Sequence, residues 1–266
     1  FEKLPAEVLD EIFQKVSCKD ILNMALTCKA FNSFIATSAM VMSRFKATIR
    51  MDKLRSFYKF TVGERNYSRI VVHKILTKEL PMASELLQKF GLSVKEIDLR
   101  EELSKTVIIR LFNICKNVRI IKTPKCIQKT KKKIDLDTLA LRKPGPLNLP
   151  RLKTLDFFAG SDVLVFFGSW QLKEISIQSW STEWGLLDIY EIKRFLETQN
   201  SLETMKLEDR WNMFFLSDFM ANASYRLKSL ELNEINLEFL PPANFPSFIK
   251  PHEQSLERLK CENTVL

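Results

Sequence analysis

The chain has 266 residues, of which 45% are hydrophobic and 27% are charged, and it carries a formal net charge of +9. These proportions are ordinary for a globular protein, and the length exceeds what one small domain needs. No run approaches the roughly 18 uninterrupted apolar residues of a membrane-spanning helix, and no signal-peptide pattern opens the chain, so we expect no membrane insertion. Because the first residue is Phe1 rather than methionine, we expect a fragment of a longer chain.

Cysteine usage indicates a reducing compartment. The five cysteines are odd in number and scattered, and most lie inside apolar patterns: Cys18, Cys28, Cys115, Cys126 and Cys261. This distribution is unlike a disulfide framework. We therefore expect a location in the cytoplasm and/or the nucleus, and we expect Cys115 to be a small buried hydrophobic residue.

Residues 4–35 are predicted to form three short helices. Pro5 suits the first turn of a helix, and the apolar residues that follow fall on one helical face: Val8, Leu9, Ile12, Phe13 and Val16. Residues 17–20 have the Ser-x-x-Asp form of a capping box, which predicts a second helix, and residues 28–35 predict a third. So short a segment cannot enclose a core alone and should offer apolar surface to a partner.

The same stretch resembles the F-box. The Leu-Pro-x-Glu-aliphatic-Leu start, the Ile-Phe pair, the Asp-aliphatic step and the Thr-Cys-Lys-x-Phe close stand in the order and spacing of that family. The resemblance implies docking on a Skp-family adaptor that links to a cullin scaffold, while the rest of the chain selects the protein to be ubiquitinated. The residues that it assigns to adaptor binding are Leu4, Pro5, Leu9, Ile12, Val16, Cys28 and Phe31. The alternative is an ordinary helical hairpin whose apolar residues form an internal core.

A recurring pattern follows an expected strand at residues 45–51. The phrase apolar-x-x-apolar-x-apolar begins at residues 67, 94, 118, 152, 172, 202, 227 and 256, at intervals of 27, 24, 34, 20, 30, 25 and 29 residues. These intervals average about the 20–29 residues of a leucine-rich repeat, each of which supplies one strand and one helix or turn. Apolar residues at helical spacing predict helices at 79–90, 106–115, 188–196 and 216–223, with Ser104 and Asp188 as helix-start residues.

This part resembles the irregular leucine-rich repeats of F-box/leucine-rich-repeat proteins. We therefore predict an α/β protein with a three-helix F-box at residues 1–44 and a leucine-rich-repeat solenoid at residues 45–266. The solenoid should have about eight to nine strands in a curved parallel sheet with outer helices.

The long interval contains a predicted basic insertion near residues 124–150. Between Lys116 and Lys133 the chain has eight basic residues and no acidic one. This segment could attract phosphate or an acidic partner, or it could be a solvated loop.

We expect neither catalysis nor a cofactor. Cys-x-x-Cys pairs are absent, and His73 and His252 are the only histidines, so we expect no metal site. The six glycines form no phosphate-binding loop. Ordinary surface roles are expected for both histidines.

Binding is expected on the open face of the sheet. The apolar positions of each phrase should point inward, and the intervening residues, Ser176 among them, should be exposed. The residues that we assign to target binding are Asp98, Arg100, Lys122, Asp156, Phe158, Gln178, Glu208 and Asn233, with Trp180 and Trp184 in the loop after one strand. A solvated face would also be polar, and tryptophans fill gaps between repeats as well as making contacts.

Three functions stay open. The first is a non-catalytic substrate receptor of an SCF-type ubiquitin ligase whose protein target is unknown and possibly acidic. The second is a leucine-rich-repeat scaffold without ligase function. The third is phosphate or nucleic-acid binding through Lys125–Lys133, which would weaken steeply with salt and which no RNA-recognition aromatic pattern supports.

Overall fold

The computed structural model describes residues 4–50, 65–101, 103–123, 149–158, 170–178, 186–208, 220, 223–234 and 249–263. Only the backbone is described at Lys105, Phe158 and residues 186–191. The chain divides into two compact units, Phe1–Arg119 with Asn148–Arg151, and Ile120–Leu147 with Leu152–Leu266.

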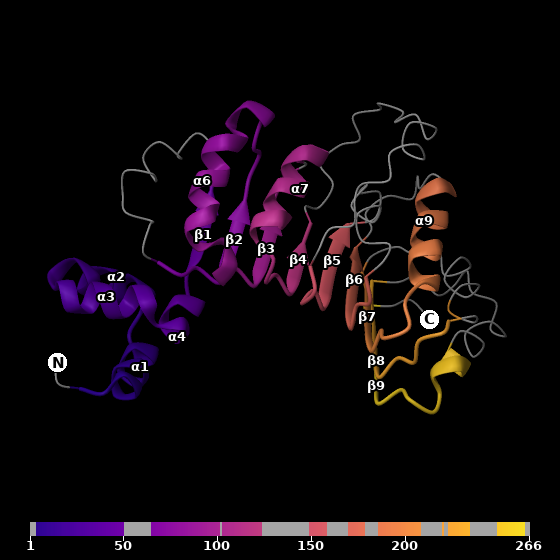
Figure 1. Ribbon diagram of the computed structural model, residues 1–266. Helices are drawn as coiled ribbons and strands as arrows, with labels where there is room; N and C mark the ends of the chain where they lie inside the picture. The colour runs from indigo at the N-terminus through magenta and orange to yellow at the C-terminus, as the bar shows by residue number, and fades with distance from the viewer. Residues whose placement is uncertain are drawn as a thin grey trace. The chain divides into compact units, whose positions relative to one another are not determined.

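The first unit begins with four helices: α1 Ala6–Lys15, α2 Cys18–Thr27, α3 Lys29–Thr37 and α4 Ala39–Ser43 (Figure 1). The capping box is confirmed, because Ser17 Oγ accepts the Asp20 N–H at 3.2 Å and donates to the Asp20 carboxylate at 2.6 Å. Helix α4 was not expected from the sequence. Ser38 caps it by accepting the Val41 N–H at 3.1 Å, which a Ser in an otherwise apolar stretch can do.

These helices share their core with the start of the sheet. Phe13 is fully buried and makes ring contacts with Phe31 at 6.0 Å and Phe34 at 5.6 Å between centroids. Phe45, directly before the first strand, and Tyr67, shortly before the second strand, pack against the same cluster. The helices therefore complete their core with residues from outside the helical segment, as their small size requires.

Within the described ranges, nine short strands follow one another in chain order in one sheet. In the first unit β1 Lys46–Ile49, β2 Arg69–Val72 and β3 Glu96–Leu99 pair parallel. In the second unit the parallel strands are β4 Ile120–Lys122, β5 Thr154–Phe158, β6 Glu174–Gln178, β7 Thr204–Glu208, β8 Ser229–Asn233 and β9 Arg258–Glu262. A helical N-terminal segment followed by a long parallel sheet of short strands confirms the predicted fold class.

The apolar phrase places side chains in register on the inner side of the sheet. Leu155, Ile175, Met205 and Leu230 are aligned across β5 to β8, and each is completely buried. The expectation that the apolar positions of each phrase point inward is wrong for β9, where Leu259 is 45% exposed. Among the described residues, the 3-10 turn η5, Lys250–His252, lies before β9.

Helices pack against this inner side in the first unit. The turn η2 Thr77–Glu79 leads into α6 Leu80–Phe90, the turn η3 Gly91–Ser93 follows, and α7 is Lys105–Ile114. Both helices lie over one side of β1–β3 (Figure 1). In the second unit α9 is Leu186–Glu197, so it begins two residues before the expected Asp188. The helix expected at 216–223 falls mostly outside the described residues.

Candidate functional site

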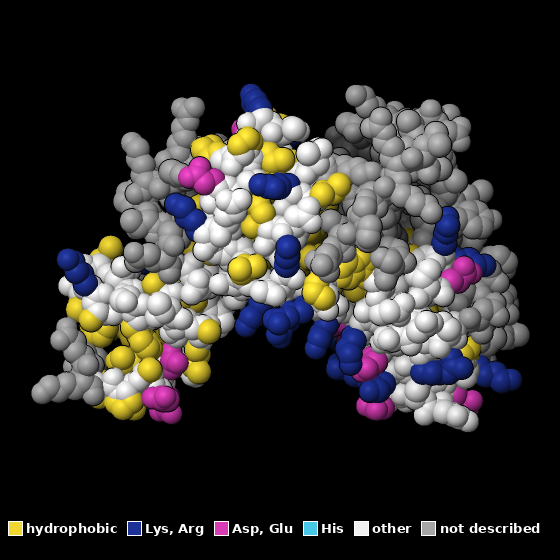
Figure 2. Space-filling model, in the orientation of Figure 1, with side chains coloured by type: hydrophobic (Ala, Val, Ile, Leu, Met, Phe, Trp, Pro, Cys, Tyr) yellow, Lys and Arg dark blue, Asp and Glu magenta, His cyan; other side chains and the backbone are white. Residues whose placement is uncertain are grey.

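Apolar side chains reach the surface of the N-terminal helices. Leu4, which precedes α1, is 38% exposed, and Val8 in the first turn of α1 is 39% exposed. Leu22 and Leu26 on α2 are 40% and 86% exposed. Leu22 and Leu26 are four residues apart within α2, so they lie on one side of that helix. Figure 2 shows hydrophobic side chains at the surface of this helical segment. Such exposure is typical of a docking surface rather than of a closed helical core.

The residues predicted to bind an adaptor divide into two groups. Leu4 and Pro5 are exposed, and Ile12 and Cys28 are half-buried at the helix surface. Half-buried Leu9, Val16 and Phe31 pack against the Phe13 core and so also hold the helices together. As adaptor contacts, all seven stay predictions.

Several exposed apolar residues of the helices were not among the residues predicted to bind an adaptor. These residues include Val8 on α1 and Leu22 and Leu26 on α2. In α2 the buried Ile21 and Ala25 stand one residue before the exposed Leu22 and Leu26. Apolar spacing alone does not show which of two adjacent rows faces outward.

An arginine fixes α1 against the end of α4. Arg44 donates through Nη1 to the Phe13 carbonyl and through Nη2 to the Val16 carbonyl at 2.8 Å. These carbonyls belong to the last turn of α1 and the residue after it, where helix carbonyls lack intrahelical donors. Ser38, which precedes α4, donates to the Asp10 carboxylate at 2.5 Å. Helix α1 is thereby held at both its middle and its end.

Comparison with known protein families identifies this segment. Residues 1–39 match the F-box domain. The F-box match thus covers α1 to α3 and ends where α4 begins. No curated protein matches the chain. Among the described residues, no helix is long and apolar enough to cross a membrane, and no three His, Cys, Asp or Glu side chains lie together as metal ligands would.

The second candidate surface is the open face of β4–β9. Backbone register aligns one residue of each strand across the sheet, with basic and acidic side chains interleaved in the order Lys122, Asp156, Ser176, Lys206, Glu231 and Lys260. Arg258 approaches Glu231 at 3.6 Å, and Lys260 pairs with Glu262 at 2.7 Å. Charges of both signs therefore offset one another on this face.

Asp156 lies at the centre of this row. Burial raises the pKa of its carboxyl, while a hydrogen bond with Ser176 and the nearby Lys122 lower it. Gln178 Nε2 donates to Asp156 Oδ1 at 3.4 Å. Ser176 was expected to be exposed, but it is buried, and its side chain forms a hydrogen bond with Asp156. The structure thus brings the predicted residues Lys122, Asp156 and Gln178 together.

Another aligned row contains Phe158, Gln178, Glu208 and Asn233 at the ends of β5 to β8. Glu208 pairs with Lys206 of its own strand. Asn233 Oδ1 is buried and has no hydrogen-bond partner among the described residues. The side chain of Phe158, Trp180, Trp184 and the basic residues Lys125–Lys133 lie outside the described residues.

In the first unit the predicted residues Asp98 and Arg100 pair with each other at 2.7 Å on β3 and just after it. Arg69 of β2 forms two hydrogen bonds to Glu96 of β3, at 2.8 and 3.3 Å. Charged groups on this open face are thus also matched in pairs.

The expected surface role of His252 is wrong. His252 is 1% exposed and stacks on Tyr225 with ring centroids 5.6 Å apart. Its Nδ1 accepts the Leu227 N–H at 3.4 Å, and burial lowers its pKa to about 4. His73 is half-buried at the end of β2 and lies 3.4 Å from Glu101. The expected burial of Cys115 is confirmed, and burial raises the pKa of its thiol to about 12.

Proposed function

We propose that this chain is a non-catalytic substrate-recognition subunit of an SCF-type ubiquitin ligase. The helices α1 to α3 bind a Skp-family adaptor, which connects to a cullin. The open face of a leucine-rich-repeat sheet binds the protein to be ubiquitinated, in the cytoplasm and/or the nucleus. The chain increases the rate of ubiquitination by positioning the target, which raises the effective concentration of the target near the conjugating enzyme.

The F-box match at residues 1–39 is the observation that carries this proposal. F-box domains typically bind Skp-family adaptors. The exposed Leu22 and Leu26 on α2, with Val8 on α1 and Leu4 just before it, supply the apolar surface that such docking needs.

The sheet supports the target-binding part of the proposal. Parallel strands in register present rows of side chains at fixed spacing on an open face. Because basic and acidic groups alternate across β4–β9, we propose that the target presents both signs of charge to this face rather than an acidic surface alone. The mixed row gives register and specificity more than raw affinity.

A capture experiment tests the target-binding face. The intact chain and a Glu231→Lys variant are each purified from cells under proteasome inhibition, and bound proteins are identified by mass spectrometry. Glu231 is half-buried in the alternating row, and its reversal places three lysines on adjacent strands. We expect the variant to keep adaptor and cullin but to lose target proteins that wild type retains.

The matched control is Glu197→Lys, an equal charge reversal at an exposed residue of α9. It should retain the same target proteins as wild type. Identical captured sets for wild type and Glu231→Lys would contradict the assignment of this face. Captured proteins that a reconstituted ligase fails to ubiquitinate would instead favour the scaffold function.

A further inference from the structure

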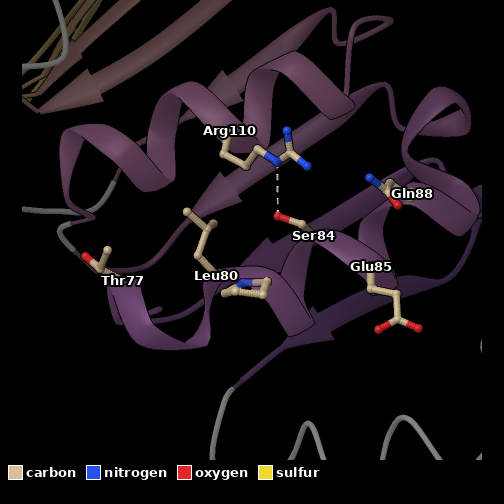
Figure 3. Close-up of a pocket in the computed structure, with 7 residues that line it drawn as sticks. Thr77, Leu80, Ser84, Glu85, Gln88 and Arg110 are labelled. Carbon is tan, nitrogen blue, oxygen red and sulfur yellow. Dashed lines mark hydrogen bonds between the residues drawn. The ribbon is translucent and has the colours of Figure 1, made fainter.

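A groove of about 420 Å³ lies on the helical layer of the first unit. It is lined by side chains from η2 and α6, namely Thr77, Leu80, Pro81, Ser84, Glu85 and Gln88, and by Arg110 from α7 (Figure 3). Because α6 and α7 lie over one side of β1–β3, the groove is separate from the open face of the sheet (Figure 1). It also lies outside the F-box match at residues 1–39.

Arg110 and Ser84 are joined across the groove. Arg110 Nε donates to Ser84 Oγ at 3.3 Å, and Ser84 is only 5% exposed (Figure 3). This bond orients the guanidinium but occupies only one of its five N–H groups. In the described part of the chain the two terminal nitrogens of Arg110 have no hydrogen-bond or ion-pair partner.

The other polar groups of the groove add further donors. The Gln88 amide and the Thr77 hydroxyl line it without a described partner, and Ser84 uses its hydroxyl oxygen as an acceptor, so its proton is available. Glu85 lies at the rim with its carboxylate turned away from Arg110 (Figure 3). Leu80 and Pro81 supply an apolar wall. The groove therefore combines a cationic, donor-rich side with an apolar one.

We propose that this groove binds a segment of a partner protein that places an Asp or Glu carboxylate against Arg110 and an aliphatic side chain against Leu80 and Pro81. A guanidinium already oriented through Nε presents its remaining N–H groups as a fork that matches a planar carboxylate. The volume accommodates one acidic side chain with an apolar neighbour, and the groove is open to solvent, as a protruding peptide requires. This interaction surface does not rest on the ubiquitin-ligase function.

Titration of the intact, isotope-labelled chain with short peptides, followed by nuclear magnetic resonance, tests the proposal. The probes are acetyl-Leu-Glu-Leu-amide and its neutral twin acetyl-Leu-Gln-Leu-amide, with inorganic phosphate as a third ligand. The Glu peptide should shift the Arg110 Nε signal and the Ser84 amide signal and should bind about tenfold more tightly than the Gln peptide.

Variants assign that preference to Arg110. Arg110→Gln should bind both peptides equally, and Arg110→Lys should lose most of the preference because an ammonium lacks the planar fork. Arg119→Gln, which removes an exposed arginine of the same unit outside the groove, should keep the full preference. Equal binding of the two peptides to wild type, or shifts confined to residues outside α6 and α7, would overturn the proposal. Phosphate that reproduces the shifts at the same concentration would show a general anion site and would overturn it too.

Discussion

His252 shows how the environment of one residue can differ from what its neighbours in sequence suggest. Its surroundings Lys250, Pro251 and Glu253 are those of a polar turn. The stacking partner Tyr225 and the hydrogen-bond donor Leu227 stand on the preceding repeat, 27 and 25 residues away. Contacts between successive repeats are set by the stacking of the sheet, which local sequence does not reveal.

His252 predicts an acid sensitivity of the fold. Because its pKa falls from 6.5 in the unfolded chain to about 4 in the native protein, the unfolded state binds more protons between these values. The stability of the fold should therefore decrease as the pH falls from about 6.5 toward 4, by roughly 2 kcal/mol from this residue. Urea unfolding at pH 7.5 and 4.5 measures the difference.

Two variants separate this residue from other acid-sensitive groups. His252→Phe keeps a ring for Tyr225 to stack on but cannot titrate, so it should show a smaller loss of stability between the two pH values. Tyr225→Phe removes a hydroxyl that has no hydrogen-bond partner in the described part of the chain, and it should keep the wild-type loss. An unchanged loss in His252→Phe would show that another group is responsible.

At the scale of the element, Arg44 stabilises the C-terminal end of α1. Its guanidinium donates to the carbonyls of Phe13 and Val16, and also to Gln14 at 3.3 Å. Replacing Arg44 with Met leaves the end of α1 without these charged donors and should lower the free energy of unfolding by about 1–3 kcal/mol. Lys15→Met removes a cation from the same helix end without such contacts and should change stability by less than about 0.5 kcal/mol. Equal effects in urea unfolding would contradict this role.

The absence of a side chain at Gly91 allows the end of α6 to lie close to the end of α7. A Cβ at this position would lie 2.6 Å from Ile114 Cγ2 and 3.3 Å from the Ile114 carbonyl oxygen. Gly91→Ala should therefore lower the free energy of unfolding by about 1–3 kcal/mol. In an Ile114→Ala background, which removes Cγ2, the same change should cost less. A denaturation cycle that gives the same cost in both backgrounds would show that this contact is not the cause.

Elements were predictable where one local rule decides them. The Ser17–Asp20 capping box and the apolar phrases placed α2 and the strands correctly, because caps and strand periodicity depend on near neighbours. Helix α4 was missed because five residues show no clear period, and its stability depends on Ser38 and on packing of Val41 and Met42. The boundary expected at residue 44 stays a prediction, since Phe45 packs with the helices.

For the whole molecule, the sequence predicted a helical F-box before a parallel sheet because repetition is visible without knowing any contact. The sequence alone did not show which side of α2 is exposed and which is buried, since both sides carry apolar residues. The division between Ile21 and Leu22 depends on where Phe13 and Ile35 lie in three dimensions.

Adaptor binding is the central claim, and exposed residues test it more cleanly than buried ones. Replacing Leu9 would disturb the Phe13 core as well as any interface. Leu22→Asp with Leu26→Asp changes exposed residues of α2, so the fold should persist while the apolar surface is lost. Thr106→Asp with Asn113→Asp adds the same charges to exposed positions of α7 and serves as the control.

The deciding measurement is the dissociation constant of the intact chain for a purified Skp-family adaptor, for wild type and both double variants. We predict that wild type and the α7 variant bind equally and that Leu22→Asp/Leu26→Asp binds at least about 100-fold more weakly, since two apolar side chains no longer contribute to the interface. Equal binding of all three folded proteins, or no binding by wild type, would contradict the account.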